Sequence, residues 1–284
     1  MADHPLDALL FGAIGSLVHC SELQWRHFNQ ALREKFEAGD LACDLSPTSK
    51  SSAVEWDRES YVASLTVTGG KKRMKEFFEK KQISAPREGT TLEQVIADIH
   101  ARKSELFVEH IEREADKDGS GAGSFQLRPG VLALLKAAKA AGVKTAFVTT
   151  TVEGVMRAFV DCLGLAELLD LTVSEKDLPK WGGAGKPDPD CYLYAVQQLA
   201  AADGDKKPAR VLAVEDTWIS LQSPLAAGPD AIPATLVLPS EWSVDQDFSQ
   251  ATLRVAELTD LAAADEGEAL LKRLGQVVDE AMCR

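Results

Sequence analysis

The chain lacks the features that mark membrane, secreted and nucleic-acid-binding proteins. No hydrophobic run approaches the roughly 20 residues that a membrane helix needs, and the first residues lack the basic and hydrophobic regions of a secretory signal peptide. The 31 Lys and Arg residues are outnumbered by 44 Asp and Glu residues, so the formal net charge is −13. Binding to phosphate backbones requires the opposite excess. We therefore expect a soluble intracellular protein, in the cytoplasm or an organelle stroma, with no membrane span and no nucleic acid partner.

Cysteine is sparse and shows no pairing motif. The chain has five cysteines, an odd number, and no C-x-x-C pair. They are Cys20, Cys43, Cys162, Cys191 and Cys283. Scattered cysteines are typical of reducing compartments, where disulfides are rare. We expect free thiols.

Short hydrophobic segments of strand length alternate with helical patterns through most of the sequence. The expected strands are 8–11, 144–148, 168–173, 211–214 and 235–238. The expected helices between them are 131–141, 155–163 and 192–202. Strands that alternate with crossover helices predict an α/β fold with a doubly wound, Rossmann-like parallel sheet.

The segment 22–126 has a different pattern. It carries long amphipathic patterns at 23–38, 71–80 and 92–114 and hardly any strand signal. Polar loops are expected at 40–52 and 116–124. We therefore expect a helical domain, residues 22–126, inserted after the first strand. The α/β core then comprises 1–21 and 127–284, and it ends in an amphipathic helix at 263–284.

Polar groups and a tight turn follow the expected strands. The first strand runs into a small-residue turn at Gly12, the second ends at Thr149, and a later strand ends at Glu215 and Asp216, while Lys186 lies in a loop between them. The carboxyl ends of parallel strands form the ligand-binding edge of a doubly wound sheet. This set suits a bound phosphate, with a cation if enough carboxylates are present.

These positions and their surroundings resemble the haloacid dehalogenase superfamily, in particular its CbbY-like and beta-phosphoglucomutase-like branch. The similarity extends from about residue 6 to residue 251. The segments that carry it are Phe28–Ala31, Thr66–Lys71, His100–Lys103, Leu127–Val131, Lys186–Asp190 and Glu215–Asp216. The resemblance implies a Rossmann-like core with an inserted helical cap and a sugar phosphate as ligand.

In the core, the resemblance implies that Thr149 and Ser16 hold the phosphoryl group and that Lys186 neutralises it. It also implies that Asp216, helped by Glu215, holds a magnesium ion. Thr149 alone suits equally well a hydroxyl that caps the following helix. In the cap, the resemblance implies that the sugar phosphate meets the residues Gly69, Gly70, Lys71 and Arg102.

The sequence departs from the family pattern at the first motif. The family has an aspartate nucleophile where this chain has Gly12, and an acid–base aspartate where it has Ile14. Neither replacement can perform the lost step. One of the carboxylates that would hold magnesium is lost as well, so we expect Glu215 to pair with Lys186 instead. We expect no cofactor, and Mg²⁺ only if activity is retained. The branched side chain of Ile14 would fill the vacated space.

Three functions fit these observations. The favoured hypothesis is a HAD-like pseudoenzyme that lacks phosphatase or phosphomutase turnover and either retains a remnant sugar phosphate pocket or binds an unknown protein partner. The second is a Mg-dependent hydrolase of weak or altered activity that acts on sugar phosphates. The third is a structural subunit of a larger complex.

Overall fold

The computed structural model describes residues 6–12, 14–43, 54–67, 69–115, 125–183 and 185–284. The chain divides into two compact units, which we call the core unit (Met1–His19 with Glu114–Arg284) and the cap unit (Cys20–Arg113). From the sequence, the boundaries between core and cap were expected between residues 21 and 22 and between residues 126 and 127. The structure does not describe the expected loop at 116–124. It also does not describe residues 44–52 of the loop expected at 40–52.

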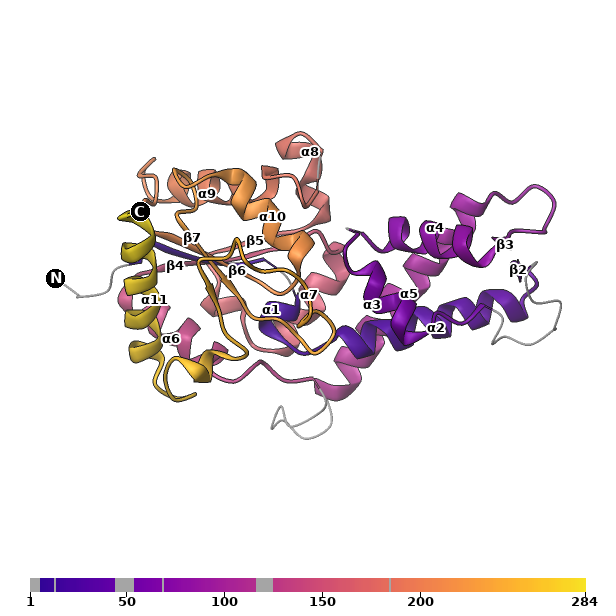
Figure 1. The fold of residues 1–284 in the computed structure, drawn as a ribbon, viewed down its shortest axis with the longest axis horizontal. Coiled ribbons are helices and arrows are strands. Elements are labelled where there is room, and N and C mark those ends of the chain that lie inside the picture. The colour runs from indigo at the N-terminus through magenta and orange to yellow at the C-terminus, as the bar shows by residue number, and fades with distance from the viewer. Residues whose placement is uncertain (1–5, 13, 44–53, 68, 116–124, 184) are drawn as a thin grey trace. The chain divides into compact units, whose positions relative to one another are not determined.

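The core unit is built on a six-stranded parallel sheet, drawn in Figure 1. The strand order is β5 (Leu171–Val173), β4 (Lys144–Val148), β1 (Ala8–Phe11), β6 (Val211–Glu215), β7 (Ala234–Val237) and β8 (Leu253–Arg254). Every neighbouring pair is parallel. The expected α/β fold with a Rossmann-like parallel sheet is therefore confirmed.

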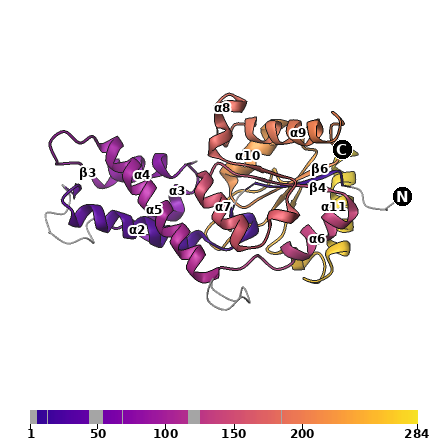
Figure 2. The same ribbon diagram turned by 180° about the vertical axis from the view of Figure 1, so that it is seen from behind.

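Helices cover both faces of this sheet (Figures 1 and 2). One face carries α6 (Val131–Ala141), α7 (Glu153–Cys162) and α11 (Gly267–Met282), and the other carries α9 (Asp190–Ala202) and α10 (Trp218–Ala227). Because both faces are covered, the central strand β1 is hydrophobic throughout rather than alternating. All four residues of β1 are fully buried.

Short elements connect these parts. They are α1 (Ile14–Leu17), α8 (Leu178–Trp181) and the 3-10 helices η2 (Ala166–Leu168), η3 (Glu175–Asp177) and η4 (Leu258–Asp260). The expected strand 168–173 was too long, because its first residue belongs to η2 and the strand begins at Leu171.

The cap unit is mainly helical. It contains α2 (Ser21–Glu37), α3 (Arg58–Ser64), α4 (Gly70–Lys81) and α5 (Leu92–Ala115), with a two-stranded antiparallel ribbon of β2 (Ala42–Cys43) and β3 (Ile83–Ser84). The ribbon corrects the expectation of a plain loop from residue 40. In the cap interior Trp56 stacks on Phe77 at 4.8 Å between ring centroids, and the Asn29 side chain bonds the Trp56 backbone N–H and carbonyl.

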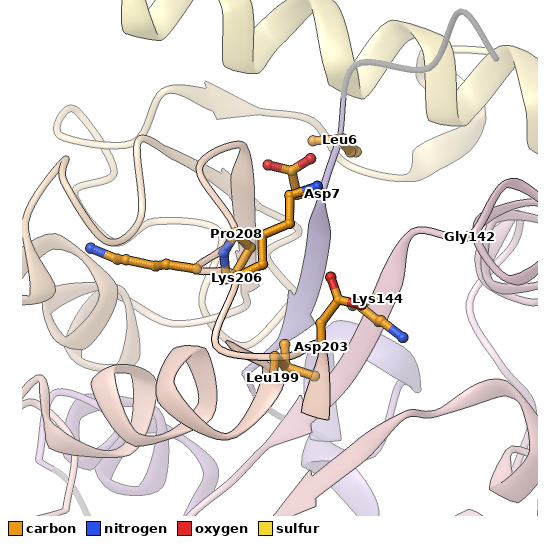
Figure 3. A pocket seen from close by; sticks show the side chains of 9 residues that line it. Leu6, Asp7, Gly142, Lys144, Leu199, Asp203, Lys206 and Pro208 are labelled. Atoms are coloured by element: carbon orange, nitrogen blue, oxygen red, sulfur yellow. The ribbon is translucent and has the colours of Figure 1, made fainter. Parts of the chain in front are cut away.

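A cavity of about 230 Å³ lies in the core unit at the amino ends of the strands (Figure 3). Leu6 and Asp7 precede β1, Lys144 begins β4 and Pro208 precedes β6, and all four line it. Parallel strands present their carboxyl ends at the opposite edge, so this cavity is separate from the expected ligand site.

Among the described residues, no helix combines the length and hydrophobicity needed to cross a membrane. None of the five cysteines, all of which the structure describes, forms a disulfide, as expected.

Candidate functional site

The carboxyl edge of the sheet brings the ends of three adjacent strands together. β1 lies between β4 and β6, so Gly12, Thr149 and Glu215 end neighbouring strands. Lys186 reaches the same edge from the loop before α9. We call Gly12, Lys186, Tyr192, Glu215 and Asp216 the core cluster.

A buried ion pair forms the centre of the core cluster. Lys186 Nζ lies 2.6 Å from Glu215 Oε1 and also donates to the carbonyl oxygen of Gly12. The Tyr192 hydroxyl donates to the same Glu215 oxygen at 2.6 Å. Lys186 is 5% exposed and Glu215 is fully buried, so the low local polarity strengthens these bonds. The pairing of Lys186 with Glu215 expected from the sequence is confirmed.

The space beside Gly12 is occupied. A Cβ atom added to Gly12 would lie 1.9 Å from the Tyr192 hydroxyl oxygen and 2.1 Å from Glu215 Oε1. Both distances are far below van der Waals contact, so no side chain fits at residue 12 unless these groups move. From the sequence, Ile14 was expected to fill this space. Ile14 is buried in α1, but the atoms nearest Gly12 come from Tyr192 and Glu215.

Asp216 packs against the next glycine of the same turn. A Cβ atom on Gly15 would lie 1.8 Å from Asp216 Oδ2. Burial, helped by the charge of Glu215, raises the pKa of Asp216 to about 7, although Lys186 and Arg128 act in the opposite direction. The carboxyl group is therefore close to half protonated at neutral pH.

The two hydroxyl residues expected to hold phosphate are buried. Thr149 Oγ1 accepts a hydrogen bond from the Thr151 backbone N–H at 3.1 Å, which stabilises the turn after β4. It does not cap α7, whose N-cap is Val152. Ser16 lies inside α1. The phosphate roles of Thr149, Ser16 and Lys186 remain predictions.

The core cluster does not fit a resident magnesium ion. Glu215 Oε2 is buried and has no hydrogen-bond partner among the described residues, which by itself suits a cation. However, Glu215 Oε1 already accepts from Lys186 and Tyr192, so an ammonium group supplies the local positive charge. In the described part of the chain, no group of three or more His, Cys, Asp and Glu residues could hold a metal. Oxygen-rich coordination is what Mg²⁺ requires.

The cap unit contains a second cluster, which the sequence analysis missed. We call Gln24, Phe28, Arg73, Lys103 and Phe107 the cap cluster. Lys103 Nζ lies 5.1 Å from the ring centroids of both Phe28 and Phe107, and donates to Gln24 Oε1 at 3.1 Å. The guanidinium of Arg73 lies 6.0 Å from the Phe28 centroid. Within the described residues, neither cation forms an ion pair with a carboxylate.

The predicted cap residues lie elsewhere in the same unit. Arg102 pairs with three glutamates of the cap surface, at 2.8 to 3.2 Å. They are Glu34, Glu105 and Glu109. Lys71 is exposed, and Gly69 is the N-cap of α4 with a positive φ of 87°. Gly70 is buried, and a Cβ atom there would lie 2.8 Å from the His100 ring. The ligand roles of these four residues stay predictions.

A hydrophobic helix face could have identified Lys103. It lies four residues after Ile99 and four before Phe107, both buried on α5, so it occupies the interior side of the helix. Arg102 is one residue away, about 100° around the helix, and faces the glutamates instead.

Comparison with known proteins agrees with this architecture. The haloacid dehalogenase-like hydrolase family matches residues 27–228. Protein CbbY of Cereibacter sphaeroides is 33% identical over 274 residues, covering 92% of this chain and 97% of that protein. A CBBY-like protein of Arabidopsis thaliana is 32% identical over 249 residues, covering 86% of this chain and 66% of that protein.

Solved structures are similar over the same extent. CbbY from Rhodobacter sphaeroides in complex with phosphate has a TM-score of 0.66 and 28% identity, and covers 91% of this chain and 97% of that one. A mutant of that protein in complex with xylulose-(1,5)bisphosphate has a TM-score of 0.67 and 27% identity, with the same coverage. This chain therefore belongs to the haloacid dehalogenase-like hydrolase family and, within it, to the CbbY-like branch.

Proposed function

We propose that this CbbY-like protein binds a phosphorylated sugar without hydrolysing it. The observation that carries the proposal is the occupied space beside Gly12, where Tyr192 and Glu215 stand in place of a side chain. The family resemblance puts the nucleophilic aspartate at this position. A glycine offers no nucleophile, and its neighbours leave no room for one.

Neither of the two groups beside Gly12, Tyr192 and Glu215, replaces the missing nucleophile. Burial and the charge of Glu215 raise the pKa of Tyr192 well above its ordinary value, so its phenol stays protonated and poorly nucleophilic. Glu215 Oε1 is held by Lys186 and Tyr192. Ile14 has no titratable group for acid–base catalysis. These features support a pseudoenzyme rather than a hydrolase with relocated residues.

The cap cluster supports retained ligand binding. Arg73 and Lys103 lie over the same Phe28 ring without a carboxylate partner in the described residues. Lys103 is buried and Arg73 is half-buried, and neighbouring cations that are removed even partly from water are costly unless an anion neutralises them. The ligands bound to the CbbY structures make a phosphorylated sugar the class that we propose.

Phosphate release and ligand binding, measured in parallel, test this function. We expect no phosphate release from xylulose-1,5-bisphosphate or other sugar phosphates with Mg²⁺, above the background of an Asp216→Ala variant. We expect the same ligands to raise the melting temperature and to give a saturable calorimetric titration. Magnesium-dependent release that Asp216→Ala abolishes would favour the alternative of a weak or altered hydrolase. Absence of both release and binding would favour a structural or protein-interaction subunit.

Reversal of the first motif provides a stricter test of the core cluster. Gly12→Asp with Ile14→Asp restores both aspartates, but the new side chain at residue 12 would collide with Tyr192 and Glu215. We therefore expect more activity when Tyr192→Phe removes the hydroxyl oxygen as well, because only the Glu215 carboxylate must then move. Tyr192→Phe alone serves as the matched control and should remain inactive. Activity in the natural chain would contradict the proposal.

A further inference from the structure

Lys103 is an unusual lysine. Only 7% of the residue is exposed, and its ammonium nitrogen lies over two aromatic rings with one neutral hydrogen-bond partner, Gln24. Buried lysines are normally paired with a carboxylate. In the part of the chain that the structure describes, Lys103 forms no such pair. Burial without a counter-charge therefore favours the uncharged amine, although the ring faces attract the ammonium form.

The charged and titratable groups around Lys103 act mostly in the same direction. Burial, followed by the positive charge of Arg73 from α4, lowers the pKa of Lys103 to about 8, while Cys20, which precedes α2, acts weakly in the opposite direction. Burial and the charges of Lys103, Lys71 and Arg73 lower the pKa of His100 on the same helix to about 4, so that ring stays neutral. A much larger share of Lys103 is thus unprotonated near neutral pH than of an ordinary lysine.

A guanidinium group lies near this amine. Arg73 contacts the same Phe28 ring as Lys103, and its guanidinium also lies 5.5 Å from the Tyr61 ring centroid. The Arg73 Nε atom is buried and finds no hydrogen-bond partner in the described part of the chain. Guanidinium groups bind phosphate in a bidentate manner. The cap cluster therefore combines an anchor for phosphate with a neutral amine.

We propose that Lys103 is a nucleophilic amine that condenses with the carbonyl group of a phosphorylated aldehyde or ketone, with Arg73 holding the phosphate. A neutral amine in a hydrophobic site is the form in which lysine attacks carbonyl compounds. The proposal shares its ligand class with the proposed function and deepens it, but it does not require the core cluster to be inactive.

The reaction balances without an oxidant or reductant. The lone pair of Lys103 Nζ attacks the carbonyl carbon, a C–N bond forms, and the carbonyl oxygen takes up a proton to give a carbinolamine. The oxygen then leaves as water with the two protons that the amine has lost, and a C=N bond forms. The product is an imine, and water reverses the reaction. A lysine of pKa about 8 can enter this sequence near neutral pH.

Reductive trapping with a phosphorylated aldehyde tests the proposal on the intact chain. The probe is pyridoxal 5′-phosphate with sodium cyanoborohydride, at a limiting concentration, and the labelled lysine is identified by peptide mass spectrometry. We expect Lys103 to be labelled at least tenfold faster than the exposed Lys72, with a rate that rises through a midpoint near pH 8. Labelling of exposed lysines without Lys103 would overturn the proposal.

Two comparisons separate the amine from the phosphate anchor. Pyridoxal, which lacks the phosphate, should label Lys103 several-fold more slowly. In the Arg73→Gln variant, the phosphorylated probe should label Lys103 only as fast as pyridoxal does. Equal rates for the two probes in the natural chain would overturn the role of Arg73. Lys103→Arg keeps the positive charge and should abolish the label, whereas Lys72→Arg should leave it unchanged. Site mapping on the natural chain does not depend on whether a variant folds.

Labelling of Lys103 and hydrolysis in the core can be measured separately, so failure of this inference can be told apart from failure of the proposed function. Sugar phosphate hydrolysis in the core would contradict the proposed function and leave labelling of Lys103 intact. An unlabelled Lys103 would contradict this inference and leave the absence of hydrolysis intact.

Discussion

At the residue scale, the carboxyl group of Asp216 couples folding to pH. Its pKa is raised from 3.8 to about 7, chiefly by burial, so the folded protein keeps a proton that the unfolded chain has released between these values. Stability is therefore fully present below about pH 4 and falls as pH rises towards 7. We expect the free energy of unfolding of Asp216→Asn, measured with urea, to rise relative to that of the parent between about pH 4 and pH 7. Above pH 7 the difference between the two should stay constant. Asp230→Asn, on an exposed residue, is the control and should follow the parent.

The Lys186–Glu215 pair gives the second prediction at this scale. Removal of one partner leaves a buried charge without its counter-charge, which typically costs about 3–5 kcal/mol. We expect losses of that size for Glu215→Gln and for Lys186→Met in chemical denaturation. The double variant, Lys186→Met with Glu215→Leu, should lose clearly less than the sum, because no charge is then left unpaired. A loss in the double variant equal to the sum of the two single losses would contradict this prediction. Glu22→Gln, which breaks an exposed pair with Arg26, should cost less than about 1 kcal/mol.

At the scale of elements, Arg128 connects segments that are far apart in sequence. Its buried guanidinium donates to four backbone carbonyls and to one carboxylate. The acceptors are the carbonyl oxygens of Gly15, Leu238, Pro239 and Ala256 and the side chain of Glu257. These groups belong to α1 and to the segments that follow β7 and β8. One side chain thus holds together the turn after β1 and the sheet edge.

We predict that Arg128→Met lowers the free energy of unfolding by at least about 3 kcal/mol, since several buried carbonyls lose their donor. Arg128→Lys keeps the charge but cannot reach as many acceptors, so we expect it to recover less than half of the loss. Hydrogen exchange should increase in residues 14–18 and 253–257, and less elsewhere. A lysine variant as stable as the parent would contradict the geometric argument.

Elements with a strong pattern could be predicted from the sequence. The strands β1 and β4 and the amphipathic helix α6 begin and end as expected. Burial on both faces of a sheet leaves a continuous hydrophobic run, and burial on one face of a helix leaves a periodic pattern. The strands β2, β3 and β8 have two residues each and are too short to show a period. They depend on pairing with a neighbouring strand, which composition does not reveal.

The candidate site could be predicted only in part for a similar reason. Glu215 and Lys186 could be paired from the sequence because strand and loop ends share one edge of a parallel sheet. Tyr192 could not be placed, because its hydroxyl reaches the site from α9, where the pattern indicates an ordinary buried position. Lys103 could be placed on the interior side of α5 from the helical spacing, but its contacts with α2 could not be predicted.

At the scale of the whole molecule, the net charge of −13 attracts divalent cations without any specific site. Such attraction is screened by salt and does not distinguish one divalent ion from another. Binding at a real magnesium site would instead be saturable and would persist at moderate ionic strength. This difference gives a way to test whether the ammonium of Lys186 has replaced a metal ion in the core cluster.

We predict that the chain has no saturable site for Mg²⁺ or Mn²⁺. In 0.15 M salt, electron paramagnetic resonance should find added Mn²⁺ free in solution, and EDTA should leave the melting temperature unchanged, because Lys186 already supplies the positive charge beside Glu215. The variant Gly12→Asp, Ile14→Asp, Tyr192→Phe adds carboxylates at the same turn and should bind about one Mn²⁺. Stoichiometric binding to the natural chain that Asp216→Ala abolishes would show that the core cluster rearranges around a metal ion, and that the buried ion pair is only its resting arrangement.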